Sequence, residues 1–180
     1  MASSHGFIDF CFSVASSLVA SCLFLVLILV FLRPSIKISE IICKGTDYKG
    51  EPCYILKFYN TSVFSAFDAE ITFLELEEEQ AEPKGKHLWF ETIELATPHF
   101  SVVPRWIPNF MVKNHAYHCF QIRTYHDLEP SLMDKHKWLQ VKITLRHGLT
   151  GLSKNFIKNY RTTSVVKPGK FELGNSFKVI

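Results

Sequence analysis

The sequence has no lysine or arginine before Arg33, so all 20 of its basic residues lie in the remainder of the chain. It also has little net charge, because these 20 residues oppose 17 Asp and Glu. So small a net charge does not indicate the basic surface with which proteins bind DNA or RNA, and we expect no nucleic-acid partner. With 47% hydrophobic and 14% aromatic residues, the chain is too apolar to be disordered as a whole.

The short motifs that accompany common catalytic and metal chemistry are missing as well. The sequence contains no GxSxG, no HExxH, no Gly-rich phosphate loop and no CxxC, so we expect neither an enzyme nor a cofactor. His115, His118 and Cys119 could be read as metal ligands. However, His118 and Cys119 are adjacent, and neighbours in a strand point to opposite faces. We therefore expect no metal site.

One long hydrophobic run stands out. From Phe10 to Leu32 the chain has 23 residues without a charge, a proline or a glycine. As a helix this run spans roughly 34 Å, which crosses a ~30 Å hydrocarbon core. A cleaved signal peptide fits poorly, because residues 1–9 have no basic residue and the run exceeds ~7–15 residues. We predict a short flank at 1–9, a transmembrane helix at 10–32 and a domain at 33–180.

The orientation follows from the basic residues beside the run. Arg33, Lys37 and Lys44 follow it, whereas the N-terminal flank has none. The positive-inside rule then places the domain in the cytoplasm and the N-terminus outside. An opposite reading, a secreted or receptor-like module, would be favoured by glycosylation of the Asn60-Thr61-Ser62 sequon. It would also be favoured by a disulfide between Cys43 and Cys53, which flank a predicted hairpin.

Two groups of residues near the membrane are candidate contact sites. Ser13, Ser17 and Ser21 recur every four residues, a spacing of small residues that lets membrane helices pack closely. Arg33, Lys37 and Lys44 could face anionic phospholipid head groups. The alternatives are that the serines merely tolerate lipid and that the basic residues only set the topology.

After the run, the hydrophobic pattern has a period of two. Leu139, Val141, Ile143 and Leu145 alternate with polar residues, as in a strand with one buried face. Further predicted strands lie at residues 36–43, 53–59, 69–73, 87–95, 117–125, 156–163 and 171–179. Predicted turns lie at 45–52, 80–86 and 166–169, and residues 98–114 are predicted to be a loop. The pattern predicts an all-β, immunoglobulin-like antiparallel β-sandwich.

Three tryptophans and one acidic run complete the predictions. Trp89 and Trp138 fall in predicted strands, so we expect both in the core. Trp106 lies between Pro104 and Pro108, where an exposed indole would contact a partner or the membrane surface. The acidic residues at 75–79 are expected to form a solvated strand end.

Several segments resemble the inner helix and cytoplasmic domain of inward-rectifier potassium channels. Arg33-Pro34 ends the hydrophobic run and is followed by IKIS at residues 36–39; the other matching segments are CYILKFYN at 53–60, residues 66–74, DLEPSL at 127–132, and the tail from Tyr160 to FELGNSF at 171–177. The resemblance implies a sandwich-type domain on a membrane helix, and it implies that Arg33 contacts phosphoinositides. The first membrane helix, the pore helix and the Gly-Tyr-Gly filter of that family are absent from the sequence, so we expect no selective potassium conduction from this chain alone.

These patterns favour a single-pass membrane protein whose β-sandwich is a non-catalytic interaction or regulatory module at the cytoplasmic membrane face. Its expected partners are membrane lipids and either another protein or further copies of itself. One alternative is a membrane-perturbing effector or pore component with a ligand-sensing domain. Another alternative, which rests on the resemblance alone, is an accessory subunit of an inward-rectifier-like channel.

Overall fold

The computed structural model describes residues 3–31, 33–81, 85–107, 119–147 and 151–180. The chain divides into two units, Met1–Arg33 and Pro34–Ile180. The first unit is the helix α1 (Ser3–Phe31). Its segment Asp9–Leu29 has a mean hydropathy of 2.5, and no residue of that segment is buried. One N-terminal helix is therefore long and apolar enough to cross a membrane, and a helix satisfies its backbone hydrogen bonds internally in lipid.

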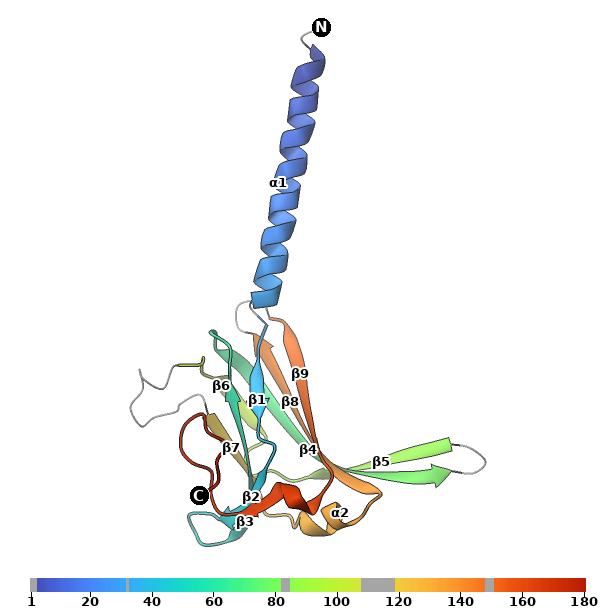
Figure 1. The fold of residues 1–180 in the computed structure, drawn as a ribbon, viewed down its shortest axis with the longest axis vertical. Coiled ribbons are helices and arrows are strands. Elements are labelled where there is room, and N and C mark those ends of the chain that lie inside the picture. Colours follow the sequence, from blue (N-terminus) through green and yellow to red (C-terminus); the bar gives the residue numbers. More distant parts are fainter. Residues whose placement is uncertain (1–2, 32, 82–84, 108–118, 148–150) are drawn as a thin grey trace. The chain divides into compact units, whose positions relative to one another are not determined.

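The second unit is built from two five-stranded sheets (Figure 1). The first sheet contains β1 (Ile36–Ile38), β2 (Ile42–Thr46), β3 (Pro52–Asn60), β7 (Cys119–Thr124) and β10 (Val166–Pro168). Strand β3 lies at its centre and pairs antiparallel with β1 and β2 along one edge and with β7 along the other. Strand β10 pairs parallel with β2.

The second sheet contains β4 (Ala66–Ala81), β5 (Gly85–Ile93), β6 (His99–Val103), β8 (Lys137–His147) and β9 (Ser153–Tyr160). Strand β4 pairs with β5, β6 and β8, and β9 follows β8. The register of β4 shifts at a bulge between Phe67 and Glu70. Within the bulge Asp68 adopts φ +48°, a conformation that aspartate tolerates better than most residues. A short helix, α2 (Glu129–Met133), and a 3-10 turn, η1 (Thr163–Val165), complete the described elements.

Both sheets contribute to one hydrophobic core. Leu139, Val141, Ile143 and Leu145 are each at most 1% exposed, which confirms the period-two prediction for β8. Three aromatic rings connect the layers: the ring centroid of Phe100 on β6 lies 6.2 Å from Phe58 and 4.7 Å from Phe120, both in the first sheet. This two-layer, largely antiparallel arrangement agrees with a β-sandwich.

The C-terminal tail covers the outer face of the first sheet. Phe171 and Val179 pack against Cys43, Cys53 and Ile55 in a second, smaller cluster. The tail closes on itself where Lys170 and Ile180 exchange backbone hydrogen bonds. The turn needs Gly169, whose φ is +127° and whose position would place a Cβ 2.5 Å from the carbonyl oxygen of Ile180. Because of this cover, β3 is buried on both faces.

Lys57 is the polar residue at the centre of that covered face. Its side chain is 1% exposed, and its ammonium donates hydrogen bonds to the carbonyl oxygens of Glu172 (2.6 Å) and Ser176 (2.7 Å). Burial lowers the pKa of Lys57, because the charged form loses water contacts. Both acceptor carbonyls belong to the tail, so the ammonium of Lys57 joins β3 to the tail.

Several local predictions are wrong. Residues 171–179 form no regular strand but an irregular tail with one bridge between Phe171 and Val179, whereas the predicted turn at 166–169 contains β10. The predicted loop at 98–114 begins with β6, which finds a partner in β4; residues 108–114 lie outside the described part of the chain. The predicted strand 36–43 breaks after Ile38, where the backbone carbonyl of Ser39 accepts a hydrogen bond from the hydroxyl of Tyr160 (2.6 Å).

Replacing Lys57 with Met keeps the aliphatic stem and removes the ammonium. We expect Lys57→Met to destabilise the protein by roughly 1–3 kcal/mol, because two partly buried carbonyls lose their charged donor, and to make the tail easier to cleave. Thermal unfolding and limited proteolysis of the full chain in mild detergent measure both effects. Lys178→Met, at an exposed position of the same tail, is the control. Equal thermal stability and equal protease sensitivity of Lys57→Met and Lys178→Met would contradict the proposal that Lys57 stabilises the tail.

Candidate functional site

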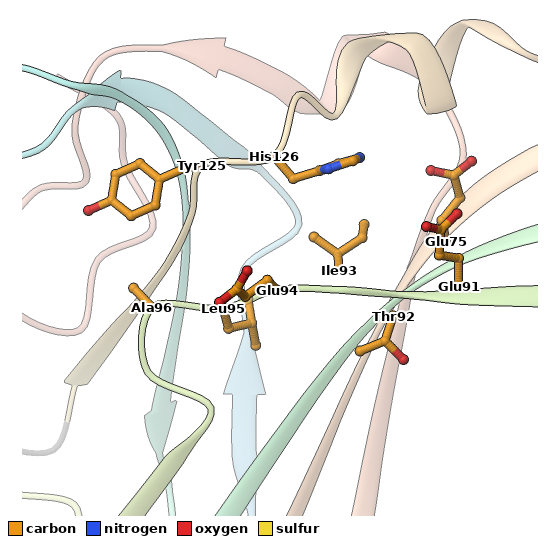
Figure 2. A pocket seen from close by; sticks show the side chains of 9 residues that line it. All are labelled: Glu75, Glu91, Thr92, Ile93, Glu94, Leu95, Ala96, Tyr125 and His126. Carbon is orange, nitrogen blue, oxygen red and sulfur yellow. The ribbon is translucent and has the colours of Figure 1, made fainter.

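A cavity of about 500 Å³ lies where the end of β5 approaches the segment after β7. Its lining consists of Glu75, Glu91, Thr92, Ile93, Glu94, Leu95, Ala96, Tyr125 and His126. Figure 2 shows Glu75 and Glu91 together at one end of the cavity, with His126 extending towards them from the segment that follows β7. Tyr125 lies at the far end. Glu94 lies between these two ends, so acidic side chains occur along the lining and not at one end alone.

Two hydrogen bonds hold the walls of this cavity together. The Thr124 hydroxyl donates to the carbonyl oxygen of Glu94 (2.7 Å), and the Ala96 amide donates to the carbonyl oxygen of Arg123 (2.9 Å). These bonds join the end of β7 in the first sheet to the segment that follows β5 in the second sheet. The cavity is thus built at a junction between the two sheets.

Glu75 is the most constrained carboxylate in the lining. It accepts hydrogen bonds from the Lys137 ammonium (2.9 Å) and the Ser131 hydroxyl (2.5 Å), and its side chain is 15% exposed. Burial acts to raise the pKa of Glu75, but the hydrogen bonds from Lys137 and Ser131 outweigh it and hold the pKa below its usual range. Glu75 is therefore charged at neutral pH and already paired.

The other two carboxylates differ from Glu75. Within the described ranges, neither Glu91 nor Glu94 forms an ion pair, and both are exposed. The chemistry that such a lining can offer is acceptance of hydrogen bonds and attraction of positive charge. Among the described residues, no group of three His, Cys, Asp or Glu is placed to hold a metal ion.

A second feature lies next to the cavity. Beyond Glu77, where β4 stops pairing with β8, residues 78–81 of β4 pair with residues 85–88 of β5. We call residues 78–81 and 85–92 the β-arm, and Figure 1 shows its distal part extending away from the rest of the domain. Leu88, Trp89 and Phe90 of the arm are 50%, 62% and 71% exposed. The β-arm therefore presents apolar side chains to solvent.

The structure corrects both tryptophan core predictions and part of the prediction for the acidic run. Trp89 is not in the core, because β5 extends past the layer that would have covered it; its indole instead donates a hydrogen bond to Glu79 (2.8 Å). Trp138, the other expected core residue, is half-buried beneath the guanidinium of Arg161. The acidic run at 75–79 is a solvated strand end in part: it lies in the C-terminal half of β4, where Glu77 and Glu79 are exposed, whereas Glu75 is largely buried and pairs with Lys137.

The sequence-predicted membrane residues fall in both units. Ser13, Ser17 and Ser21 lie on α1 and are exposed, and Arg33 belongs to the same unit. Lys37 is exposed on β1. Lys44 is on β2, where its ammonium pairs with Glu129 (2.6 Å) and lies over the ring of Tyr54. Lys44 thus has partners within the domain, and the packing role of the serines and the lipid contacts of the basic residues stay predictions.

Asn60 has a structural role that its sequon did not indicate. Its side chain is fully buried; its amide donates to the carbonyl oxygens of Phe64 and Pro104 (3.0 Å each), and its Oδ1 accepts from Ser62. The folded chain therefore offers no free amide for a glycan at Asn60.

Trp106 is 37% exposed, and its role as a partner or membrane contact stays a prediction.

The cysteines of the domain are buried or half-buried thiols. Cys43 is opposite Ile55 and Cys53 is opposite Gly45, so the two thiols are not a directly opposed pair, and both are free. Cys119 lies in β7, with its thiol 3.9 Å from Asn175 Oδ1. Burial raises the pKa of Cys43 and Cys119 to about 11. His115 and His118, the other members of the rejected metal group, lie outside the described residues.

The sequence interpretation missed the cavity and the arm. Alternating glutamates at 75, 77 and 79 are a period-two pattern that places them on one face of a strand. Three consecutive apolar residues, Leu88 to Phe90, place apolar side chains on both faces of a strand. Read together, these signals indicate a ribbon with an acidic face. The cavity depends on contacts between β5 and β7, which no local pattern reveals.

Comparisons with known proteins add no functional assignment. No family model matches the chain, and no curated protein matches it. Among solved structures, the chain is similar to the X-ray structure of Northeast Structural Genomics Consortium target SoR45, with 9% identity and a TM-score of 0.33, over 78% of this chain and 93% of that one. The resemblance to inward-rectifier channels therefore stays a prediction.

Glu75 provides a test of the electrostatics of this site. A group with a lowered pKa contributes stability above its unfolded pKa, and this contribution is lost as the pH falls through the folded value. We expect Glu75→Gln to destabilise the protein by roughly 1–3 kcal/mol at pH 7, because Lys137 loses a charged acceptor. The difference from the wild type should shrink below about pH 4.

Thermal unfolding of the full chain in mild detergent, followed across pH, measures this difference. Glu94→Gln removes a charge from the same cavity at a position for which the described residues show no ion pair, and it is the matched control. A loss of stability in Glu75→Gln that stays the same at every pH would contradict the proposed charge state of Glu75.

Proposed function

We propose that this chain is a single-pass membrane protein whose immunoglobulin-like β-sandwich is a non-catalytic interaction module at the cytoplasmic face. Membrane lipids hold the helix, and a protein partner or a second copy of the chain binds the domain. The basic residues Arg33, Lys37 and Lys44 are proposed to lie on the lipid side, with Trp106 as a further contact.

The helix supports the membrane part of this proposal. An apolar helix whose segment Asp9–Leu29 has no buried residue would expose a large apolar surface to water, which lipid would cover at a gain of roughly 25 cal/mol per Å². The absence of basic residues before the helix and the presence of Arg33 directly after it support the inward orientation.

The observation that carries the interaction part is the exposed apolar segment Leu88-Trp89-Phe90 of the β-arm. Contiguous exposed apolar side chains on a soluble domain are typical of binding surfaces. An indole and a phenyl ring are among the side chains that contribute most to protein interfaces. The acidic cavity lies beside this segment, so a partner with basic residues next to an apolar strand would match both features.

A second candidate is a membrane-perturbing effector or pore component. It is favoured by Ser13, Ser17 and Ser21, which lie along one side of α1 and would allow close helix packing. Replacing the three serines with Leu should then abolish ion leakage from vesicles that contain the chain, and an unchanged leak would exclude this candidate. The accessory-subunit alternative requires co-purification with a channel subunit that carries a selectivity filter.

The topology can be tested by thiol labelling, although Cys43 and Cys53 are at most 1% exposed and react poorly when folded. Tyr48 is 81% exposed in the β2–β3 turn, so Tyr48→Cys supplies an accessible thiol on the domain. We expect a membrane-impermeant maleimide to label it only after permeabilisation of the cells, and to label Ser4→Cys in intact cells. Labelling of Tyr48→Cys in intact cells would contradict the cytoplasmic placement.

A further inference from the structure

The β-arm contains a strand with an open edge. Among the described strands, β5 pairs with β4 alone, from Gly85 to Ile93. Natural edge strands are protected by charges, bulges or covering loops. Strand β5 has an unbroken register with β4, and its central residues Leu88, Trp89 and Phe90 are all apolar. An open and regular edge of this kind is suited to pairing with another strand.

The sequence of β5 is complementary to itself when it is read in the opposite direction. In an antiparallel pair centred on Trp89, Leu88 is opposite Phe90 of the second copy, and His87 is opposite Glu91 of the second copy. A two-fold axis through the centre produces each of these pairs twice. Opposed aliphatic–aromatic and acid–base pairs are the combinations that stabilise antiparallel strands.

Other symmetric registers lose this complementarity. In an antiparallel pair, residues directly opposite each other point to the same face of the sheet. The two-fold axis of a β5–β5 pair can therefore be centred on any single residue of β5, but not between two residues. With Leu88 at the centre, His87 is opposite Trp89 and Glu91 is opposite Gly85. With Phe90 at the centre, Glu91 is opposite Trp89 and His87 is opposite Ile93. Of these three registers, the one centred on Trp89 alone opposes His87 and Glu91.

The two faces of the paired strands would also be matched. Phe90 is opposite Leu76 of β4 in the described register, and Leu76 is buried. Pairing about Trp89 would place Leu88 and Phe90 of both copies together on that face, next to Leu76. On the other face the two Trp89 side chains would meet, each already held by Glu79. The exposed apolar side chains of the arm would thereby cover one another.

We propose that the partner of the β-arm is a second copy of this chain, bound by antiparallel pairing of β5 with β5 about Trp89. This joins the second sheets of two copies into one continuous sheet. The charge complementarity of His87 with Glu91 selects a second copy over an unrelated strand. The proposal names the partner of the proposed interaction module, but it does not depend on which side of the membrane the domain occupies.

Engineered cysteines distinguish this register in the full chain in membranes. In the proposed pairing Trp89 is the residue that faces itself, so Trp89→Cys places two thiols within reach of a disulfide. Thr92 is offset from its own copy by six positions, or about 20 Å, so Thr92→Cys is the matched control. Under copper-phenanthroline oxidation we expect at least about ten-fold more cross-linked dimer for Trp89→Cys. Equal yields would overturn the register.

Charge variants test the same contact without removing Trp89. We expect His87→Glu to place like charges opposite Glu91 and to weaken the dimer several-fold in mild detergent, as measured by sedimentation. Adding Glu91→Lys to His87→Glu restores an opposite-charge pair and should restore the dimer. A chain that is monomeric throughout, or a dimer that none of these changes affects, would overturn the proposal. Neither outcome alters the result of the topology assay, so the two proposals fail separately.

Discussion

The burial of β3 on both faces is the constraint on which the domain depends. One face of the strand contributes Tyr54, Leu56 and Phe58 to the main core, and the other lies under the C-terminal tail. A central strand can be covered twice only if its polar groups find partners. Lys57 meets this requirement through two tail carbonyls, so one buried cation ties the end of the chain to the middle of the first sheet.

The second sheet differs from the first, because part of its longest strand, β4, is left uncovered. Strand β4 is covered where it crosses the core, at Ile71 and Phe73, and becomes exposed where it continues past it. Its register with β8 ends at Glu77, and beyond that point β5 is the one described strand that pairs with it. A two-stranded ribbon in water gains little stability from its own contacts. The arm therefore has apolar surface and an open edge, both of which pairing with another strand would remove.

The sequence predicted the parts of this structure that depend on local pattern. Alternation identified β8 and its buried face, and the uncharged run identified the helix. The prediction failed where distant segments decide the outcome: the strand 171–179 was wrong because the tail lies over β3 rather than at a sheet edge. Trp89 was misplaced because periodicity describes the faces of a strand but not how far the strand extends past its neighbours. The cavity was missed because its walls, Glu91 to Ala96 and Tyr125 to His126, come from different sheets.

The acidic cavity and the apolar arm meet at the same residues. Glu91 lines the cavity, and it is also the acid of the proposed β5 pairing. A second copy at β5 would place its own His87 beside Glu91, which adds a basic group next to a lining that has Glu75 already neutralised by Lys137. Pairing would in this way reduce the negative charge at the mouth of the cavity. Self-association would then weaken the binding of a positively charged ligand in the cavity, because both use Glu91.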